Sequence, residues 1–172
     1  NFLFRVREFE MMELEFFVKP GEDKKWHEYW KKERLEWYLN LGIQKENIKL
    51  IDLPKEDIAH YSKGTSEVWY KWPFTSTHGG DSFGELEGIA NRGDYDLSQH
   101  AKHTGKDIVY FEQETNEKFV PYVIEPSVGV GRAMLAFLID AYMEEEVGEN
   151  GKQGRVLLKL HPKLAPVKVA VF

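Results

Sequence analysis

The chain has 172 residues, 42% of them hydrophobic and 14% aromatic, which is enough apolar material for one domain with a buried core. It contains no cysteine, so a disulfide framework and a Cys-ligated zinc site are excluded. The formal net charge of −6 argues against a surface devoted mainly to nucleic-acid phosphates, and no apolar run approaches the length of a membrane-spanning helix.

The first predicted element is a long strand over residues 4–18, which contain no Gly or Pro. With the period of two expected for a strand, one face is mainly apolar and is predicted to lie in the core: it carries Phe4, Val6, Met12, Leu14, Phe16 and Val18. The other face carries Arg5, Arg7, Phe9, Met11, Glu13 and Glu15. This row of guanidinium, aromatic and carboxylate groups suits a charged ligand with a flat ring, although a solvated face with cross-strand ion pairs explains it equally well.

An aromatic helix is predicted next, starting after Pro20-Gly21 and stopping at Gly42. Trp26, Trp30 and Trp37 recur at helical spacing, and we interpret them as a packing stripe rather than as platforms for base stacking. The solvent side is predicted to carry Lys24, Lys25, Lys31 and Lys32. Strands are expected at residues 48–53 and 68–74, with a short helix from Pro54 between them.

The middle of the chain alternates loops and short elements. A loop is predicted over residues 75–82, followed by a strand over residues 83–90 in which Glu85 and Glu87 share a face. Asp94 is predicted to cap a helix that runs through His103 and is closed by Gly105. Residues 115–117 are expected to turn a hairpin between strands 108–111 and 119–125. The six histidines form no metal-ligand pattern.

The run VIEPSVGVGRAMLAFLID at residues 123–140 carries the strongest functional signal. An apolar strand ends in Glu125-Pro126-Ser127, and a helix is predicted over residues 133–146. Gly129 and Gly131 allow a ligand to approach the backbone closely and leave the first amides of the helix free to meet an anion, next to Arg132. A buried Glu–Arg pair at a strand–helix junction is the structural alternative. The order of elements predicts an α+β fold, a mostly antiparallel sheet backed by helices.

Two of these stretches together resemble a known family. RVREFEMMELEFF and EPSVGVGRAMLAFL are similar to motifs 2 and 3 of class II aminoacyl-tRNA synthetases, and the wording is nearest to the glycyl-tRNA synthetase family. Further stretches resemble the same family and extend the likeness over nearly the whole chain: WHEYWKKERLEWYLNLGI, HYSKGTSEV, GELEGIANRGDYDLSQHAKHTG and LAPVKVAVF.

The resemblance implies an incomplete catalytic core. Residues 1–161 would be a partial catalytic domain, with a helical and loop insertion at about 20–80, and residues 162–172 would start an anticodon-binding domain, with a strand from Ala165 to Phe172. The family's motif 1 and the first strand of its motif 2 are expected outside the chain, so the segment alone is expected to be weakly active or inactive. The parent enzyme would be a cytoplasmic homodimer with no membrane contact.

The activity that the resemblance implies is that of a glycine–tRNA ligase using ATP and Mg²⁺. Arg5 and Arg132 would be the catalytic cations, Phe9 would stack on adenine, and Glu85 would hold ATP with its magnesium. The full implied ATP site is Arg5, Val6, Phe9, Glu85, Leu86, Gly129, Val130, Gly131 and Arg132.

The implied glycine site consists of Glu13, Glu125, Pro126 and Ser127. Glu13 and Glu125 would face the ammonium, and they repel each other unless a cation lies between them. An alternative is a non-catalytic relative, such as the accessory subunit of mitochondrial DNA polymerase, which binds nucleic acid; the retained Glu13, Glu125, Ser127 and Arg132 disfavour it. A third alternative is a fragment with this fold and no turnover.

Overall fold

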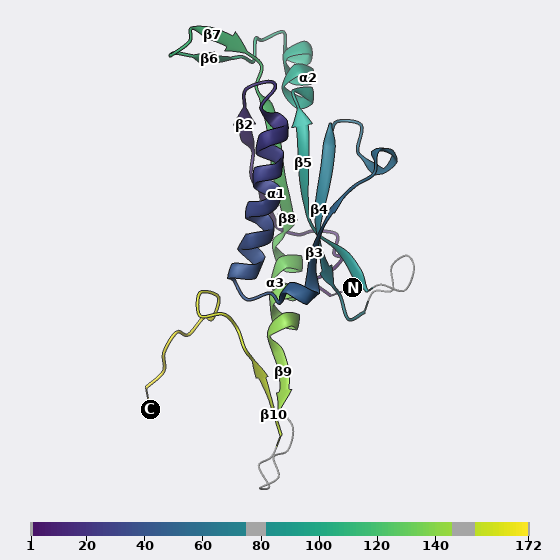
Figure 1. Cartoon of the computed structure of the whole chain (residues 1–172), viewed down its shortest axis with the longest axis vertical. Coiled ribbons are helices and arrows are strands. Elements are labelled where there is room, and N and C mark those ends of the chain that lie inside the picture. Colours follow the sequence, from purple (N-terminus) through teal and green to yellow (C-terminus); the bar gives the residue numbers. More distant parts are fainter. Residues whose placement is uncertain (1, 75–81, 146–153, 172) are drawn as a thin grey trace.

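The computed structural model describes residues 2–74, 82–145 and 154–171. In these residues an antiparallel sheet has the strand order β1-β8-β5-β4-β3 (Figure 1). After a short interruption, β2 continues the pairing of β1 along the same strand, β8. The strands are β1 Met11–Glu13, β2 Phe16–Val18, β3 Ile48–Asp52, β4 Gly64–Lys71, β5 Phe83–Gly93 and β8 Tyr122–Gly129. The helices are α1 Asp23–Asn40, α2 Tyr95–Thr104 and α3 Val130–Ala141. The predicted α+β fold with an antiparallel sheet is therefore confirmed.

Two hairpins project from opposite ends of this body (Figure 1). One pairs β6 Tyr110–Glu112 with β7 Glu117–Phe119, and the other pairs β9 Tyr142–Glu145 with β10 Arg155–Leu158. Asn116 has a positive φ of 54° in the first hairpin, which confirms a turn there. The second strand of this hairpin is β7 and not the predicted 119–125, most of which belongs to β8 of the central sheet. Single 3₁₀ turns at Lys45–Asn47 and Lys55–Asp57 flank β3, the second where a short helix was expected.

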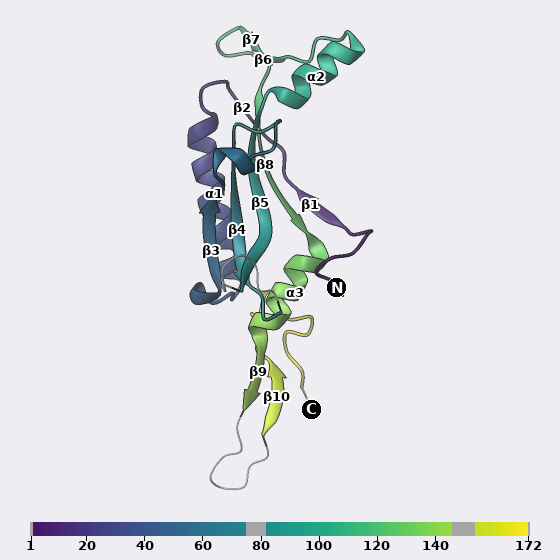
Figure 2. The same ribbon diagram turned by 90° about the vertical axis from the view of Figure 1, so that its right-hand side faces the viewer.

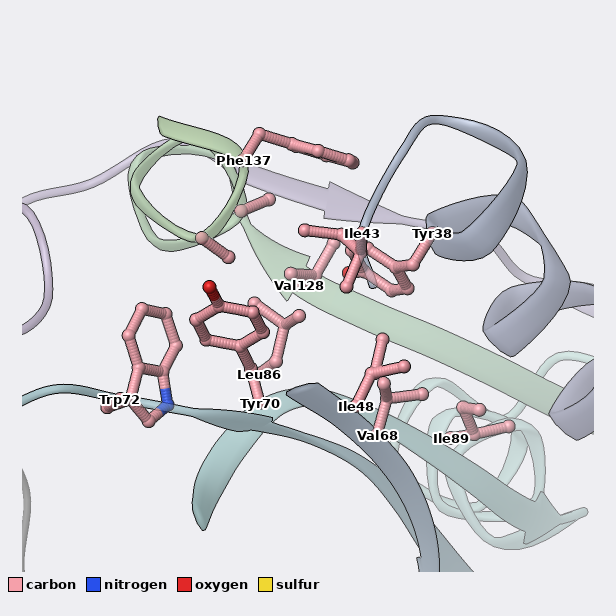
Figure 3. Packing of buried hydrophobic residues seen from close by; sticks show 12 residues of the cluster. Tyr38, Ile43, Ile48, Val68, Tyr70, Trp72, Leu86, Ile89, Val128 and Phe137 are labelled. Carbon is pink, nitrogen blue, oxygen red and sulfur yellow. The ribbon is translucent and has the colours of Figure 1, made fainter. Parts of the chain in front are cut away.

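The core lies between the sheet and the helices α1 and α3 (Figure 3). Tyr38 of α1 stacks on Phe137 of α3, with ring centroids 5.9 Å apart. Both belong to a cluster that includes Tyr70 of β4 and Trp72, which follows that strand. Closer to the N-terminus of α1, Phe16 of β2 contacts the rings of Trp26 and Trp30. The predicted packing stripe is thus confirmed.

Lys31 corrects the prediction for the opposite side of this helix. It is 6% exposed, because its ammonium lies between the carboxylates of Glu28 and Asp52, at 2.7 and 2.8 Å. The Lys31 ammonium and the Ser66 hydroxyl together lower the pKa of Asp52. Helical periodicity marked Lys31 as solvated, but β3 passes close enough to provide a partner.

The first strand is shorter than predicted. Residues 4–10 form turns and extended loop, and β1 begins only at Met11. The ladder is interrupted between β1 and β2, where the Leu14 amide donates to the Pro126 carbonyl at 3.0 Å but Pro126 has no N–H to return the bond. Met12 and Leu14, predicted to be buried, are 40% and 37% exposed because β1 is an edge strand that diverges from α1 (Figure 2).

The C-terminal part also differs from prediction. Helix α3 ends at Ala141, and Tyr142, expected to be helical, instead begins β9 and pairs with Leu158 of β10. Glu146, the predicted helix end, lies outside the described residues, as do residues 75–81 of the predicted loop. Residues 165–171 form no strand, since no described strand lies beside them to complete a ladder.

The segment 20–80, expected as an insertion, contributes β3 and β4 to the central sheet and α1 to its face. Across the described part of the chain, no helix combines the length and apolarity that crossing a membrane requires.

Candidate active site

A cavity of about 950 Å³ opens on the face of the sheet opposite α1. Strands β5 and β8 form its floor, residues 3–11 pass over it, and the start of α3 and residues 53–61 border it. Figure 2 shows the N-terminal segment and α1 on opposite sides of the sheet. The cavity gathers most of the predicted site residues: Arg5, Val6, Phe9, Glu85, Leu86, Glu125, Ser127, Gly129, Val130, Gly131 and Arg132.

A β-bulge determines which acidic side chains of β5 reach this cavity. Trp69 pairs with Glu85 but Val68 pairs with Glu87, so that Leu86 is an extra residue and the sides of the strand exchange. Glu85 therefore opens into the cavity, whereas Glu87 is 1% exposed beneath α1. The prediction that these two glutamates share a face is wrong.

Glu87 instead holds the helix to the sheet. It accepts hydrogen bonds from Arg34 at 2.6 and 3.1 Å and from the Tyr38 hydroxyl at 2.6 Å. Burial and the adjacent carboxylate raise the pKa of Tyr38, so its hydroxyl remains a donor. This network has a structural role. It fixes β5, the strand that carries Glu85, to α1 on the side of the sheet away from the cavity.

Cationic and aromatic groups meet at one end of the cavity. Arg132 donates from Nε to the Phe4 carbonyl at 3.3 Å, and its Nη1 lies 3.6 Å from the Glu85 carboxylate. The guanidinium carbons of Arg132 and Arg5 lie 5.0 and 5.6 Å from the centre of the Phe4 ring. The two predicted catalytic arginines are thus brought together, around a phenylalanine that sequence reasoning assigned to the core.

Phe9 lies beside them, across Gly129. A Cβ placed on Gly129 would be 3.6 Å from the Phe9 ring and 3.9 Å from Cβ of Arg132. The Phe9 ring is 58% exposed, so a flat ligand can reach it. Gly129 has an ordinary negative φ, so the backbone conformation does not require glycine here. The missing side chain instead leaves room between the Phe9 ring and Arg132.

Acidic groups lie at the other end of the cavity, where Glu125 is part of the wall and Glu13 and Glu15 stand outside it. Register pairs Glu13 with Ser127 and Phe16 with Ile124, and it therefore sets Glu15 directly opposite Glu125. The Ser127 hydroxyl lies 3.4 Å from the Glu13 carboxylate. Burial, followed by the hydrogen bond and charge of Glu15, raises the pKa of Glu125 to about 7.

Two predicted glycine-site residues lie outside the cavity wall. Glu13 stands next to it, beside Ser127, and its charge contributes to the raised pKa of Glu125. Pro126 is buried on the other side of β8, with Ile124 and Val128. Alternation along a strand explains this placement, because Glu125 and Ser127 share a side that Pro126 cannot share.

Sequence reasoning missed two residues at the acidic end, Glu15 and Arg92. Arg92 Nη1 lies 3.1 Å from Oε1 of Glu125. Glu15 could have been found, since it alternates with Glu13 on the predicted polar face. Arg92 gave only the weak signal of a carboxylate four residues later, Asp96, with which it pairs at 2.6 Å.

Another carboxylate, Glu67, lines the cavity near Glu85 and Asp57. Burial raises its pKa, and the Trp69 indole donates to it at 2.6 Å. In the ranges 2–74, 82–145 and 154–171, no three His, Asp or Glu side chains are grouped closely enough to hold a metal ion. Glu85 alone fits magnesium only if phosphate oxygens supply further ligands, as Mg²⁺ in nucleotide sites commonly requires.

The cavity therefore combines a cationic, aromatic end suited to a nucleotide with an acidic end suited to an amine. Such a site can bring an amine-bearing acid and a nucleoside polyphosphate together. Positioning and charge neutralisation, rather than a side-chain nucleophile, are what it offers.

No protein-family model matches the chain. Among curated proteins, the glycine–tRNA ligases of Thermobifida fusca and Streptomyces coelicolor are each 57% identical to it over 174 residues, and that of Caldanaerobacter subterraneus is 55% identical over 173 residues. These matches take in the whole chain but only 37%, 37% and 35% of the relatives. The chain thus spans little more than a third of their length.

Solved structures with a similar fold include a Pyrococcus horikoshii seryl-tRNA synthetase complexed with ATP, with a TM-score of 0.59 and 18% identity over 82% of this chain and 29% of that one. A Giardia lamblia prolyl-tRNA synthetase in complex with prolyl-adenylate gives a TM-score of 0.59 and 16% identity over 79% of this chain and 24% of its own. The α+β fold is therefore that of class II aminoacyl-tRNA synthetase catalytic domains.

Proposed function

Since the chain is homologous over its whole length to a segment of the glycine–tRNA ligases, we propose that it forms part of the catalytic core of such an enzyme. The carboxylate of glycine attacks the α-phosphorus of ATP and gives glycyl-adenylate and pyrophosphate. The glycyl group then passes to the 3′ end of tRNA(Gly). The observation that carries the proposal is that Arg5, Phe9 and Arg132 line the same cavity as Glu125 and Ser127.

ATP is assigned to the cationic end. Arg5 and Arg132 neutralise phosphate charge as the glycine carboxylate attacks, which is the main requirement of adenylate formation. Phe9 stacks on adenine, and its exposed ring supports this role. The other proposed contacts are Val6, Glu85, Leu86, Gly129, Val130 and Gly131, all of which line the cavity.

Glycine is assigned to the acidic end. Its ammonium is bound by Glu125 and Glu13 with the Ser127 hydroxyl, and Pro126 contributes through the strand that holds its neighbours. Because glycine has no side chain, charge recognition and a small space are the only means of selecting it. Alanine is rejected by steric closure, since an added methyl in a roomy site changes binding by only about 1–3 kcal/mol.

Magnesium is proposed to arrive with ATP, with Glu85 as a protein ligand and phosphate oxygens as the others. Acceptance of tRNA(Gly), homodimer assembly and a cytoplasmic location belong to the same proposal on family resemblance alone. So does the division into a catalytic part at residues 1–161 and the start of an anticodon-binding domain at residues 162–172.

Glycine-dependent exchange of pyrophosphate into ATP tests the proposal on the full-length protein that carries this chain. We expect exchange with glycine and none with alanine, and Glu125→Ala and Arg132→Ala should each lower it by about 100-fold or more. Arg155→Ala, which removes an exposed arginine of the β9–β10 hairpin, is the control and should leave exchange unchanged. Absence of exchange in a folded protein that binds DNA would contradict the proposal and support the accessory-subunit alternative.

A further inference from the structure

We propose that Arg92 is the positioning residue of the amine-binding end: it holds one carboxylate oxygen of Glu125 so that the other oxygen faces the substrate ammonium. This inference rests on the proposed function. Nη1 of Arg92 lies 3.1 Å from Oε1 of Glu125, and both side chains are largely buried, with 18% and 15% of their surfaces exposed. One oxygen of the carboxylate is thereby committed to the protein.

A second bulge in β5 aims Arg92 at this target. Asn91 pairs with Ile124 and Gly93 pairs with Val123, so Arg92 is the extra residue between them. Gly93 takes a left-handed φ of 58°, and its amide donates to the Asn91 side chain. Ala90, two residues before Arg92, is the residue of β5 that pairs with Glu125 in the ladder. The bulge allows the Arg92 side chain to reach the same glutamate on the neighbouring strand.

The guanidinium is itself held in a fixed orientation. Nε and Nη2 donate to the two carboxylate oxygens of Asp96, at 2.6 and 3.0 Å, in a bidentate pair. The guanidinium carbon lies 4.2 Å from the centre of the Tyr61 ring, which borders the cavity. With three nitrogens engaged and one plane stacked, the group has little freedom left, and a lysine could not reproduce these contacts.

Charge explains why such a holder is needed. Glu15 and Glu13 approach Glu125 from the N-terminal strands, and Ser127 follows it on its own strand. Arg92 is a cation in contact with Glu125. Asp96 of α2 pairs with the same guanidinium. Arg92 therefore favours the ionised form of Glu125, which is the form that binds an ammonium, while the acidic neighbours oppose it.

A purely structural role would be different. The Arg92–Asp96 pair also connects α2 to β5, and if that connection were its whole purpose, its loss would lower stability without selecting between substrates. A positioning role predicts a defect confined to glycine, together with a changed pH dependence. These two readouts separate the alternatives.

The experiment uses Arg92→Gln, Arg92→Lys and Asp96→Asn in the full-length protein, with pyrophosphate exchange measured from pH 6 to 9. Arg92→Gln should raise the KM for glycine by about tenfold or more, the usual effect of losing a charged hydrogen-bond partner, and change the KM for ATP by less than about twofold. The pH midpoint of kcat/KM for glycine should move upward by about one unit, because the cation that favours the carboxylate is gone.

The milder variants keep the test decisive if Arg92→Gln folds poorly. Arg92→Lys retains the charge and should largely preserve the pH midpoint while still raising the KM for glycine. Asp96→Asn leaves Arg92 in place but loosens it, so its effect on this KM should be smaller than that of Arg92→Lys. Arg155→Gln on the exposed hairpin is the matched control and should change neither quantity.

The inference is overturned if Arg92→Gln, or Arg92→Lys and Asp96→Asn where the first does not fold, leaves the KM for glycine and its pH midpoint unchanged. It is also overturned if the KM values for glycine and ATP rise equally. A wild-type protein without glycine-dependent exchange would instead refute the proposed function, so the two failures are distinguishable.

Discussion

Glu15 lies directly opposite Glu125 across the interrupted ladder between the N-terminal strands and β8. Like charges directly opposite each other repel. The ladder is interrupted next to them, at Pro126, which has no N–H to donate to the facing strand. Burial first, and then the hydrogen bond and charge of Glu15, raise the pKa of Glu125 to about 7. Below about pH 7 Glu125 therefore carries a proton, which removes one of the two facing charges.

Glu125→Gln should therefore stabilise the empty protein at alkaline pH. The folded-state pKa of about 7 exceeds the usual glutamate value, so the stability that Glu125 contributes is present below the unfolded pKa and is lost as pH rises through 7. Glutamine does not titrate. The variant should be more stable than wild type by about 1–2 kcal/mol at pH 8, a figure reduced for screening by water, and nearly equal to it at pH 4.5.

Urea unfolding of both proteins at the two pH values measures this difference. Glu36→Gln, on the outer side of α1 and paired with Lys32 at 3.7 Å, serves as the control and should show little pH-dependent difference. If Glu125→Gln shifts stability by the same amount at pH 4.5 and pH 8, the carboxylate repulsion inferred here is absent.

Glu15→Gln should act on glycine use in the direction opposite to Arg92→Gln. Removing the Glu15 charge lowers the pKa of Glu125, because Glu15 is the neighbour that raises it most after burial. The pH midpoint of kcat/KM for glycine should accordingly move down by about half a unit to one unit. Exchange assays between pH 5.5 and 8.5 test this, and an upward movement would contradict the assigned roles of Glu15 and Arg92 together.

Phe9→Ala should weaken ATP binding without weakening the fold. The ring is 58% exposed, so its loss removes little buried surface, whereas stacking of a base on an aromatic ring contributes about 1–3 kcal/mol. The KM for ATP should rise by about 5-fold to 150-fold, with the melting temperature nearly unchanged. Phe17→Ala, a comparably exposed phenylalanine of β2, is the matched control. Equal effects of the two substitutions on this KM would remove Phe9 from the nucleotide site.

Local signals predicted much of the fold. The helix between Asp94 and Gly105 and the turn at Asn116 occur as expected, because left-handed residues such as Gly105 and Asn116 act within a few positions of themselves. The Asp94 side chain, predicted to cap the helix, makes no capping hydrogen bond to it. The alternation of Glu13 and Glu15 was also correctly read, since both fall on the side of the strand that meets Glu125 and Ser127.

Long-range geometry accounts for the errors. Residues 4–10 alternate like a strand but join no ladder in the described structure, and they line the cavity as a loop. The extra residues Leu86 and Arg92 each form a bulge that changes which side of β5 the following side chains occupy. A sequence pattern with a period of two cannot reveal such a bulge, because it is defined by the pairing with the adjacent strand. Arg92 was missed for this reason, because its contact with Glu125 joins residues 33 positions apart.

Gly93→Ala tests whether the second bulge matters for function. Gly93 and Gly105 both have left-handed φ values, 58° and 66°, so alanine at either should lower stability by about 1 kcal/mol. At Gly93 the new Cβ would also lie 2.8 Å from Cε of Lys63, whose flexible end can move but would disturb its contact with the Tyr122 ring. Gly105 has nothing within 4 Å of the added atom and is therefore a control for backbone strain alone.

The two variants should separate in activity. Because the bulge aims Arg92 at Glu125, Gly93→Ala should raise the KM for glycine several-fold, whereas Gly105→Ala should lose similar backbone stability and keep this KM. Urea unfolding and pyrophosphate exchange on the same preparations give both quantities. A KM for glycine that is unchanged in Gly93→Ala would mean that Arg92 reaches Glu125 without help from the bulge, and the irregularity of β5 would then be a feature of folding alone.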